Sequence, residues 1–114
     1  MSTGPDDQRQ RIDQLSGSAR RLLDYVAACG RGARYAVLRH LARVSEEDMV
    51  EDLRETVNAG VLAAAPGQPN VYDFTNDAVR ELVLAEIGEQ RLLKLRSRAE
   101  AARRRVLGER EMLP

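Results

Sequence analysis

The sequence predicts a mainly α-helical domain that carries one β-hairpin and ends in a helical extension. Apolar residues recur every three or four positions in five segments, which is the spacing of amphipathic helices. Between the third and fourth of these segments, two short extended runs flank a turn at 66–70 that is rich in proline and glycine. The length of 114 residues is typical of a single domain.

The first helix is expected to begin at Ser16, after a polar tail over residues 1–14. The serine hydroxyl can accept a hydrogen bond from the free amides of the first helical turn. Apolar residues then recur at helical spacing as far as Ala27, and Gly30 follows, as is typical of a helix end. We therefore expect a disordered tail at 1–14 and a folded domain over 15–88.

Two more helices are expected before the hairpin, over residues 34–43 and 46–59. Ser45, with Asp48 three residues later, approximates a capping box, and acids in the first turn suit the positive end of the helix dipole. The expected inward face of the helix at 46–59 consists of Met49, Val50, Leu53 and Val57. Six carboxylates form what we call the acidic helix surface: Glu46, Glu47, Asp48, Glu51, Asp52 and Glu55.

The hairpin leads directly into a helix over residues 77–87. The second extended run alternates two aromatic residues with a valine and an aspartate, which is typical of a half-buried strand. Three polar residues, Thr75, Asn76 and Asp77, stand between this strand and the helix. Because each of them is a favourable helix cap, local capping is their simplest role.

A last helix is expected over residues 89–107, followed by a tail at 108–114. Its apolar residues alternate spacings of three and four and form what we call the helix-pairing seam: Leu92, Leu95, Ala99, Ala102 and Val106. Its cations form what we call the basic helix surface: Arg91, Lys94, Arg98, Arg103, Arg104 and Arg105. A solvated helix face is the simplest interpretation of this charge. The alternatives are an acidic protein partner, a nucleic-acid contact, or pairing with the acidic helix surface.

The order of three helices and a hairpin is that of a winged helix, with a C-terminal helical extension. In this arrangement the helix at 46–59 takes the recognition position and the two-stranded hairpin is the wing. Winged helices commonly bind DNA, but this helix has six acids against one arginine, and the turn at 66–70 has no basic residue. Since carboxylates repel phosphates, the sequence disfavours specific DNA binding through helix 46–59.

Residues with catalytic chemistry are few in this chain. His40 is its only histidine and Cys29 its only cysteine, so the sequence predicts no zinc site. It contains no glycine-rich phosphate-binding loop and no pair of acids that stands out as an acid–base pair. We therefore expect no enzyme activity, no cofactor and no metal. The lone cysteine and the lack of a signal sequence or a long apolar run predict a cytoplasmic location and no membrane contact.

Several features in a fixed order carry a family resemblance. These are "LSGSARRLL", an acidic helix that ends in "NAG", a hairpin, and the junction "FTNDAVRE". Together, over residues 15 to about 106, they resemble the winged-helix region that follows the ATPase core in STAND-type signalling ATPases. That group includes bacterial ATP-binding transcriptional regulators and, more distantly, the NB-ARC proteins of plant resistance and apoptosis.

The resemblance implies a nucleotide-sensing role for the junction. In this family a sequence like "HD.VRE" often stands there, and its histidine approaches the phosphates of the bound nucleotide in the resting form. Asn76 takes the histidine position here, whereas Asp77 matches the pattern. Asparagine can donate a hydrogen bond but carries no charge at any pH. Nothing before residue 15 could form an ATPase core, so we expect either a piece of a longer protein or a free-standing relative.

We therefore expect a non-catalytic regulatory module that makes protein–protein contacts. Its partner would be an ATPase core, in the same or another chain, or a second copy of itself. One alternative is a small transcriptional regulator that contacts DNA through the basic C-terminal helix. The other is a structural dimerisation domain that pairs through the seam.

Overall fold

The computed structural model describes residues 5–112, which form six helices and one three-stranded antiparallel sheet. In chain order the elements are α1 (Pro5–Asp13), α2 (Gly17–Ala28), β1 (Ala33–Arg34), α3 (Tyr35–Ala42), α4 (Glu46–Asn58), β2 (Leu62–Ala65), β3 (Gln68–Phe74), α5 (Asp77–Ile87) and α6 (Glu89–Met112). The mainly helical class expected from the sequence is therefore confirmed.

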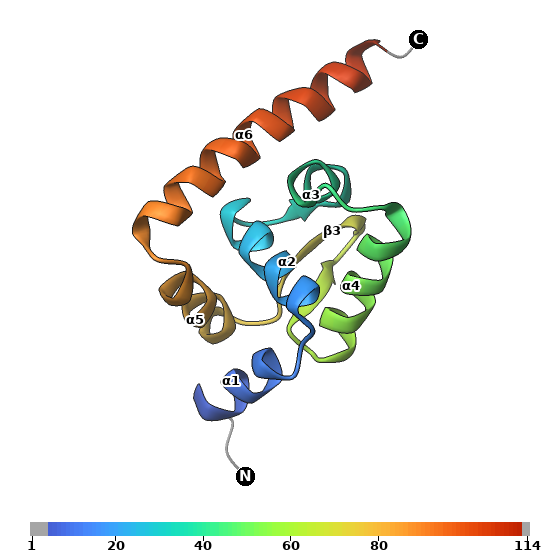
Figure 1. The fold of residues 1–114 in the computed structure, drawn as a ribbon. Coiled ribbons are helices and arrows are strands. Elements are labelled where there is room, and N and C mark those ends of the chain that lie inside the picture. The colour runs from blue at the N-terminus through green and yellow to red at the C-terminus, as the bar shows by residue number, and fades with distance from the viewer. Residues whose placement is uncertain (1–4, 113–114) are drawn as a thin grey trace.

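Helix α2 lies at the centre of the fold and packs against α3, α4, α5 and α6 (Figure 1). Its apolar face, including Leu22, Leu23 and Val26, is fully buried in the main core. Ser16 is the N-cap, because its hydroxyl accepts a hydrogen bond from the amide of Ala19 at 3.2 Å. The predicted start of this helix is confirmed.

The sheet has the strand order β1-β3-β2, so β3 pairs with both other strands. Strand β1 is only two residues long and too short for a periodic signal, which is why the sequence did not predict it. The hairpin turn is also tighter than expected. Only Pro66 and Gly67 separate β2 from β3, in place of a five-residue turn at 66–70, and Gly67 adopts a φ of 73°. A φ of this sign is accessible to glycine at little cost.

Helix α1 shows that the expected disorder of residues 1–14 is wrong for residues 5–13. This helix packs against α5, its Ile12 is buried, and Arg9 pairs with Glu86 at 2.9 Å. The segment contains a single apolar residue and therefore no helical periodicity from which to predict it. Pro5 at its first position suits a helix start. Residues 1–4 lie outside the described part of the chain.

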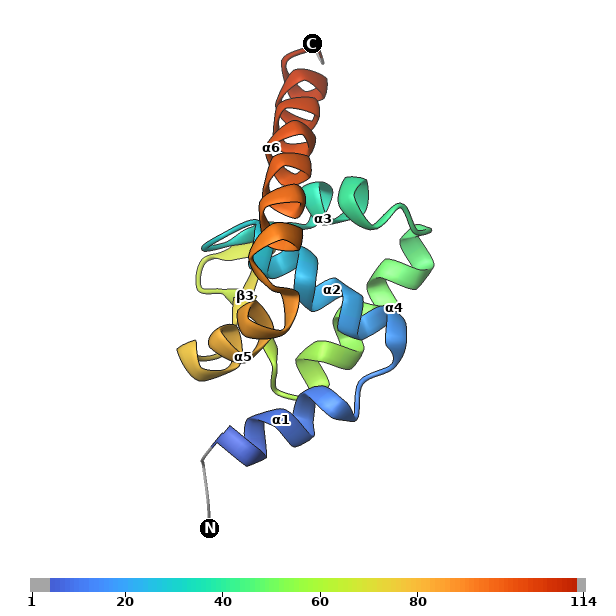
Figure 2. The same cartoon turned by 60° about the vertical axis from the view of Figure 1, so that its left-hand side comes forward.

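Helix α6 runs on to Met112, so the predicted helix end at 107 and the tail at 108–114 are wrong as far as residue 112. Residues 113–114 lie outside the described part of the chain. Its 24 residues correspond to a length of about 36 Å. Figures 1 and 2 show that its C-terminal part projects past α3 and away from the rest of the fold.

The helix-pairing seam of α6 is occupied within the chain. Leu95 joins the main core, and three further residues of the seam pack against Val37 and Leu41 of α3 in a second cluster: Ala99, Ala102 and Val106. Leu92 is partly buried against the main core. The seam therefore attaches α6 to its own domain.

Cys29 follows α2 and lies between the two apolar clusters. Burial raises the pKa of its thiol from 9.0 to about 11, although the charge of Arg103 acts in the opposite direction. Near pH 8 this shift leaves about 100-fold less reactive thiolate than in the unfolded chain. We therefore expect alkylation of the native protein by iodoacetamide, followed by mass spectrometry, to be slower than that of the denatured protein by about this factor.

The same shift has a consequence for stability. Between pH 9.0 and about 11 the unfolded chain releases the thiol proton while the folded chain retains it. The free energy of unfolding should therefore fall as the pH rises through this window, by roughly 2–3 kcal/mol from this group. Denaturant titrations of the unaltered chain and of Cys29→Ala at several pH values separate the contribution of Cys29 from that of other titrating groups. An equal fall in the free energy of unfolding in both proteins would show that Cys29 is not its source.

Candidate interaction surfaces

The strand-to-helix junction is held by local hydrogen bonds. Asn76 is the N-cap of α5, and its side-chain oxygen accepts a hydrogen bond from the amide of Val79 at 2.9 Å. The hydroxyl of Thr75 donates to the carbonyl of Gly60 at 2.8 Å. Asp77 pairs with Arg31 at 3.1 Å on the surface. The predicted capping role is confirmed for Asn76, while the nucleotide-sensing role stays a prediction.

Arg80 is a buried charge that the sequence analysis missed. Its Nη2 donates to the carboxylate of Asp73 and to the carbonyl of Gly30, each at 2.8 Å. Its guanidinium also lies 5.3 Å from the ring centroid of Phe74, within range of a cation–π contact. Arg80 thereby connects α5 to β3 and to the end of α2. The signal in the sequence was its position between Val79 and Val83, on the buried side of the helix.

The acidic helix surface is divided between two roles. Glu55 accepts hydrogen bonds from the amide and the hydroxyl of Ser16 at 2.6 and 2.9 Å. Asp52 is buried and accepts from the hydroxyl of Ser18 at 2.8 Å. Both carboxylates therefore lie at the N-terminus of α2, where they favour the positive end of its dipole.

This arrangement corrects the prediction that all six acids face solvent. Helix α4 packs against α2, so the side chains one turn apart on its inner side reach the start of α2. The acids that remain exposed are Glu46, Glu47, Asp48 and Glu51. The charge of this surface is consequently concentrated in the first two turns of α4.

A groove of about 570 Å³ lies between α4 and the hairpin. Its lining includes Val50 and Val57 of α4 and Ala64 and Tyr72 of the hairpin. Val50 is 45% exposed and Val57 is 40% exposed, so the expectation that both face inward is wrong. They lie two helical turns apart on the same side of α4 and present an apolar strip beside the exposed acids.

A second cleft, of about 550 Å³, lies between the C-terminal end of α3 and the middle of α6. Its lining includes four arginines, which together form what we call the basic cleft: Arg39, Arg43, Arg98 and Arg105. His40 and several aliphatic side chains complete the lining, which contains no acidic residue. Arg98 donates to the carbonyl of Leu41 at 2.9 Å and lies 5.9 Å from the ring centroid of Tyr25.

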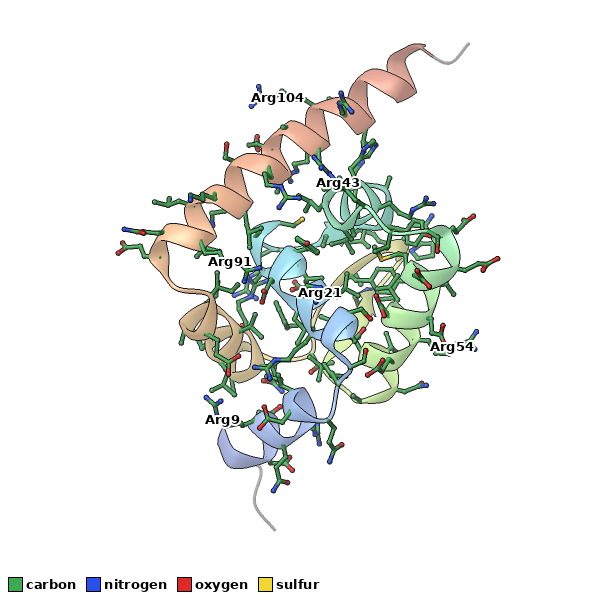
Figure 3. All side chains as sticks on the ribbon, in the orientation of Figure 1. Arg9, Arg21, Arg43, Arg54, Arg91 and Arg104 are labelled. Atoms are coloured by element: carbon green, nitrogen blue, oxygen red, sulfur yellow. The ribbon has the colours of Figure 1, made fainter. Side chains whose placement is uncertain are left out.

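The predicted basic helix surface does not form one continuous face. Arg91 pairs with Asp24 at 2.6 Å, and Arg103 lies 3.7 Å from Glu100. All four of the other cations are exposed, but Arg98 and Arg105 line a cleft with residues of α3, whereas Lys94 does not. Arg104 lies on the outer side of α6 in Figure 3. The sequence analysis missed Arg39 and Arg43, because they belong to a different helix and meet the α6 arginines only in the folded chain.

The described residues offer no preformed metal site. Among residues 7–108, whose side chains the structure describes, no three His, Cys, Asp or Glu lie close enough together to hold a metal ion. Over the same range, no helix combines the length and the apolar character needed to cross a bilayer.

Comparisons with known proteins found nothing similar: no family model, no curated protein and no solved structure matches the chain.

Proposed function

We propose that the chain is a non-catalytic regulatory module of the winged-helix type, which contacts proteins through α4 and the groove beside it. The order of elements supports the winged-helix part of this proposal. One helix, a short strand, two helices and a hairpin follow one another, and the short strand adds to the second strand of the hairpin. Helix α4 then takes the recognition position, and β2 with β3 forms the wing.

The observation that carries the functional proposal is the exposed surface of α4. Four carboxylates in its first two turns adjoin the apolar strip of Val50 and Val57. Phosphates would be repelled by this surface, which removes the usual source of nucleic-acid affinity. Apolar side chains bordered by charge are instead typical of protein interfaces. The partner would present a basic, partly apolar surface.

The resemblance noted in the sequence suggests a specific partner. In STAND-type ATPases the winged-helix region packs between the ATPase core and a downstream sensor or effector region. This module would contact such a core, in the same or another chain, and relay its nucleotide state by moving as a unit. The test is therefore binding to a STAND-type ATPase core loaded with ADP or with a non-hydrolysable ATP analogue, measured by calorimetry.

Charge reversal on α4 is expected to weaken this association. The double variant Glu47→Lys/Glu51→Lys should raise the dissociation constant at least about tenfold, because it repels a basic partner. The matched control is Glu81→Lys/Glu89→Lys, which makes the same change of charge at exposed positions on α5 and α6. Equal losses in both variants, or a chain that sediments as a monomer and binds no core in either nucleotide state, would contradict the proposal.

Contact with DNA through α6 is the second candidate function. The exposed cations on this helix, such as Lys94 and Arg104, favour it. Charge reversal at Arg103, Arg104 and Arg105 should then abolish a salt-dependent shift of labelled duplex DNA. Dimerisation through the helix-pairing seam is not proposed, because most of the seam is buried within the chain.

A further inference from the structure

We propose that the basic cleft between α3 and α6 binds an acidic segment of a partner protein. Carboxylates of this segment would pair with the arginines of the rim, and an apolar side chain would cover the aliphatic floor. The inference rests on the protein-contact function proposed above, but it concerns a surface separate from α4 and a partner of the opposite charge.

The cleft carries an unbalanced positive charge. Among residues 7–108, whose side chains the structure describes, none of its four arginines forms an ion pair with a carboxylate. Elsewhere in this range seven arginines, among them Arg9, Arg80 and Arg91, have carboxylate partners and five do not, so what sets the cleft apart is that four such arginines share one lining. The cleft therefore concentrates positive charge, which the carbonyls at the end of α3 partly offset. A bound anion would relieve this repulsion.

Stabilisation of the α3 C-terminus explains only part of this cluster. Arg98 satisfies the carbonyl of Leu41, and Arg39 lies in the last turn of α3. Arg105, by contrast, comes from α6. Arg43 adopts a φ of 54°, the left-handed conformation in which glycine is the usual residue after a helix. The chain thus places a charged residue at a backbone position that disfavours it.

The arginines of the cleft form two pairs, one at the end of α3 and one on α6. Arg39 and Arg43 are four residues apart on the α3 side, while Arg98 and Arg105 are seven residues apart along one face of α6. Apart from His40, the rest of the lining is aliphatic, and we call these residues the aliphatic floor: Leu41, Val44, Ala101 and Ala102. Figure 3 shows Arg43 next to α3, on the side of α6 that faces the body of the protein. The planar guanidinium fork suits two-point pairing with a carboxylate.

The aliphatic floor favours a protein segment over single-stranded nucleic acid. Recognition of single-stranded nucleic acid relies on stacking of bases on aromatic rings. The residues that line this cleft include no phenylalanine, tyrosine or tryptophan. Their aliphatic groups are suited to a side chain such as leucine, with carboxylates placed on either side of it.

The test is fluorescence anisotropy of a short labelled peptide that carries aspartates and glutamates around one leucine. The double variant Arg43→Glu/Arg105→Glu should weaken binding at least about tenfold. The matched control Lys94→Glu/Arg96→Glu makes the same change of charge at exposed positions of α6 outside the cleft. The control variant should lose less than about threefold in affinity for the peptide at physiological ionic strength, because distant surface charges are screened.

A second measurement does not depend on how the variants fold. On addition of the peptide to the unaltered protein, the largest amide NMR shifts should fall on the end of α3 and the middle of α6, including Leu41 and Ala102. Shifts centred on α4, no binding of the peptide, or equal losses in the cleft and control variants would overturn the proposal. Tighter binding of labelled duplex DNA, lost in the same cleft variant, would also overturn it in favour of a nucleic-acid site.

The test of the basic cleft can fail or succeed independently of the test of the α4 surface. Glu47→Lys/Glu51→Lys should bind the acidic peptide at least as well as the unaltered protein does, because it leaves the cleft intact. Loss of core binding with peptide binding retained would reject the α4 surface alone. Loss of peptide binding with core binding retained would reject the cleft alone.

Discussion

Replacing Arg80 with alanine is expected to lower the free energy of unfolding by about 3–5 kcal/mol, the usual cost of breaking a buried ion pair. The change removes the bonds to Asp73 and to the carbonyl of Gly30, as well as the contact with the ring of Phe74. It also leaves the carboxylate of Asp73, whose side chain is 27% exposed, without its cation. Urea denaturation followed by circular dichroism measures the loss.

An exposed pair at the same end of α5 provides the matched control. Arg31 and Asp77 also form an Arg–Asp pair, at 3.1 Å, but their side chains are 71% and 76% exposed. Because solvent screens such a pair, Arg31→Ala should lower the free energy of unfolding by no more than about 1 kcal/mol. Similar losses for Arg80→Ala and Arg31→Ala would show that the buried contacts of Arg80 do not hold α5 in place.

The second large effect is expected at Leu95. This residue is 4% exposed and joins α6 to the main core. Leu95→Ala should lower the free energy of unfolding by about 2–5 kcal/mol, since it removes buried methyl groups and leaves a cavity. Leu93 lies two residues earlier on the same helix and is 62% exposed. Leu93→Ala should therefore change the stability by less than about 0.5 kcal/mol.

The same two variants test whether the helix-pairing seam packs within one chain or between two copies. If the seam attaches α6 to its own domain, sedimentation velocity should give the same oligomeric state for Leu95→Ala, Leu93→Ala and the unaltered chain. A loss of stability at Leu95 that depends on protein concentration would instead mean that the leucine contributes to an interface between copies.

The starts of α2, α4 and α5 were predictable from the sequence because capping is local. Ser16, Ser45 and Asn76 each accept a hydrogen bond from the amide three residues later, so the signal lies within one helical turn. The burial of Leu22 and Leu23 likewise followed from spacing along a single helix. The helix α1 escaped prediction for the same reason, because a segment with only Ile12 as an apolar residue has no period.

The roles of the charged residues were much less predictable. Glu51 and Glu55 are both acids on the same helix, yet Glu51 faces solvent and Glu55 binds the start of α2. Nothing in the local sequence distinguishes them, because the difference depends on which side of α4 meets a helix that lies more than thirty residues earlier. Val50 and Val57 illustrate the opposite error, since their apolar character suggested burial that the packing does not provide.

The sequence alone thus determined the helices from α2 onwards, the caps of α2, α4 and α5, and the excess of acids on α4, since these depend on residues within a turn or two of one another. Only the tertiary structure decided which charges are exposed, that the seam of α6 is occupied by its own domain, and that arginines of α3 and α6 share one cleft. Arg43 and Arg105 are more than sixty residues apart in the chain, and the packing of α6 on α3 places them beside the same cleft.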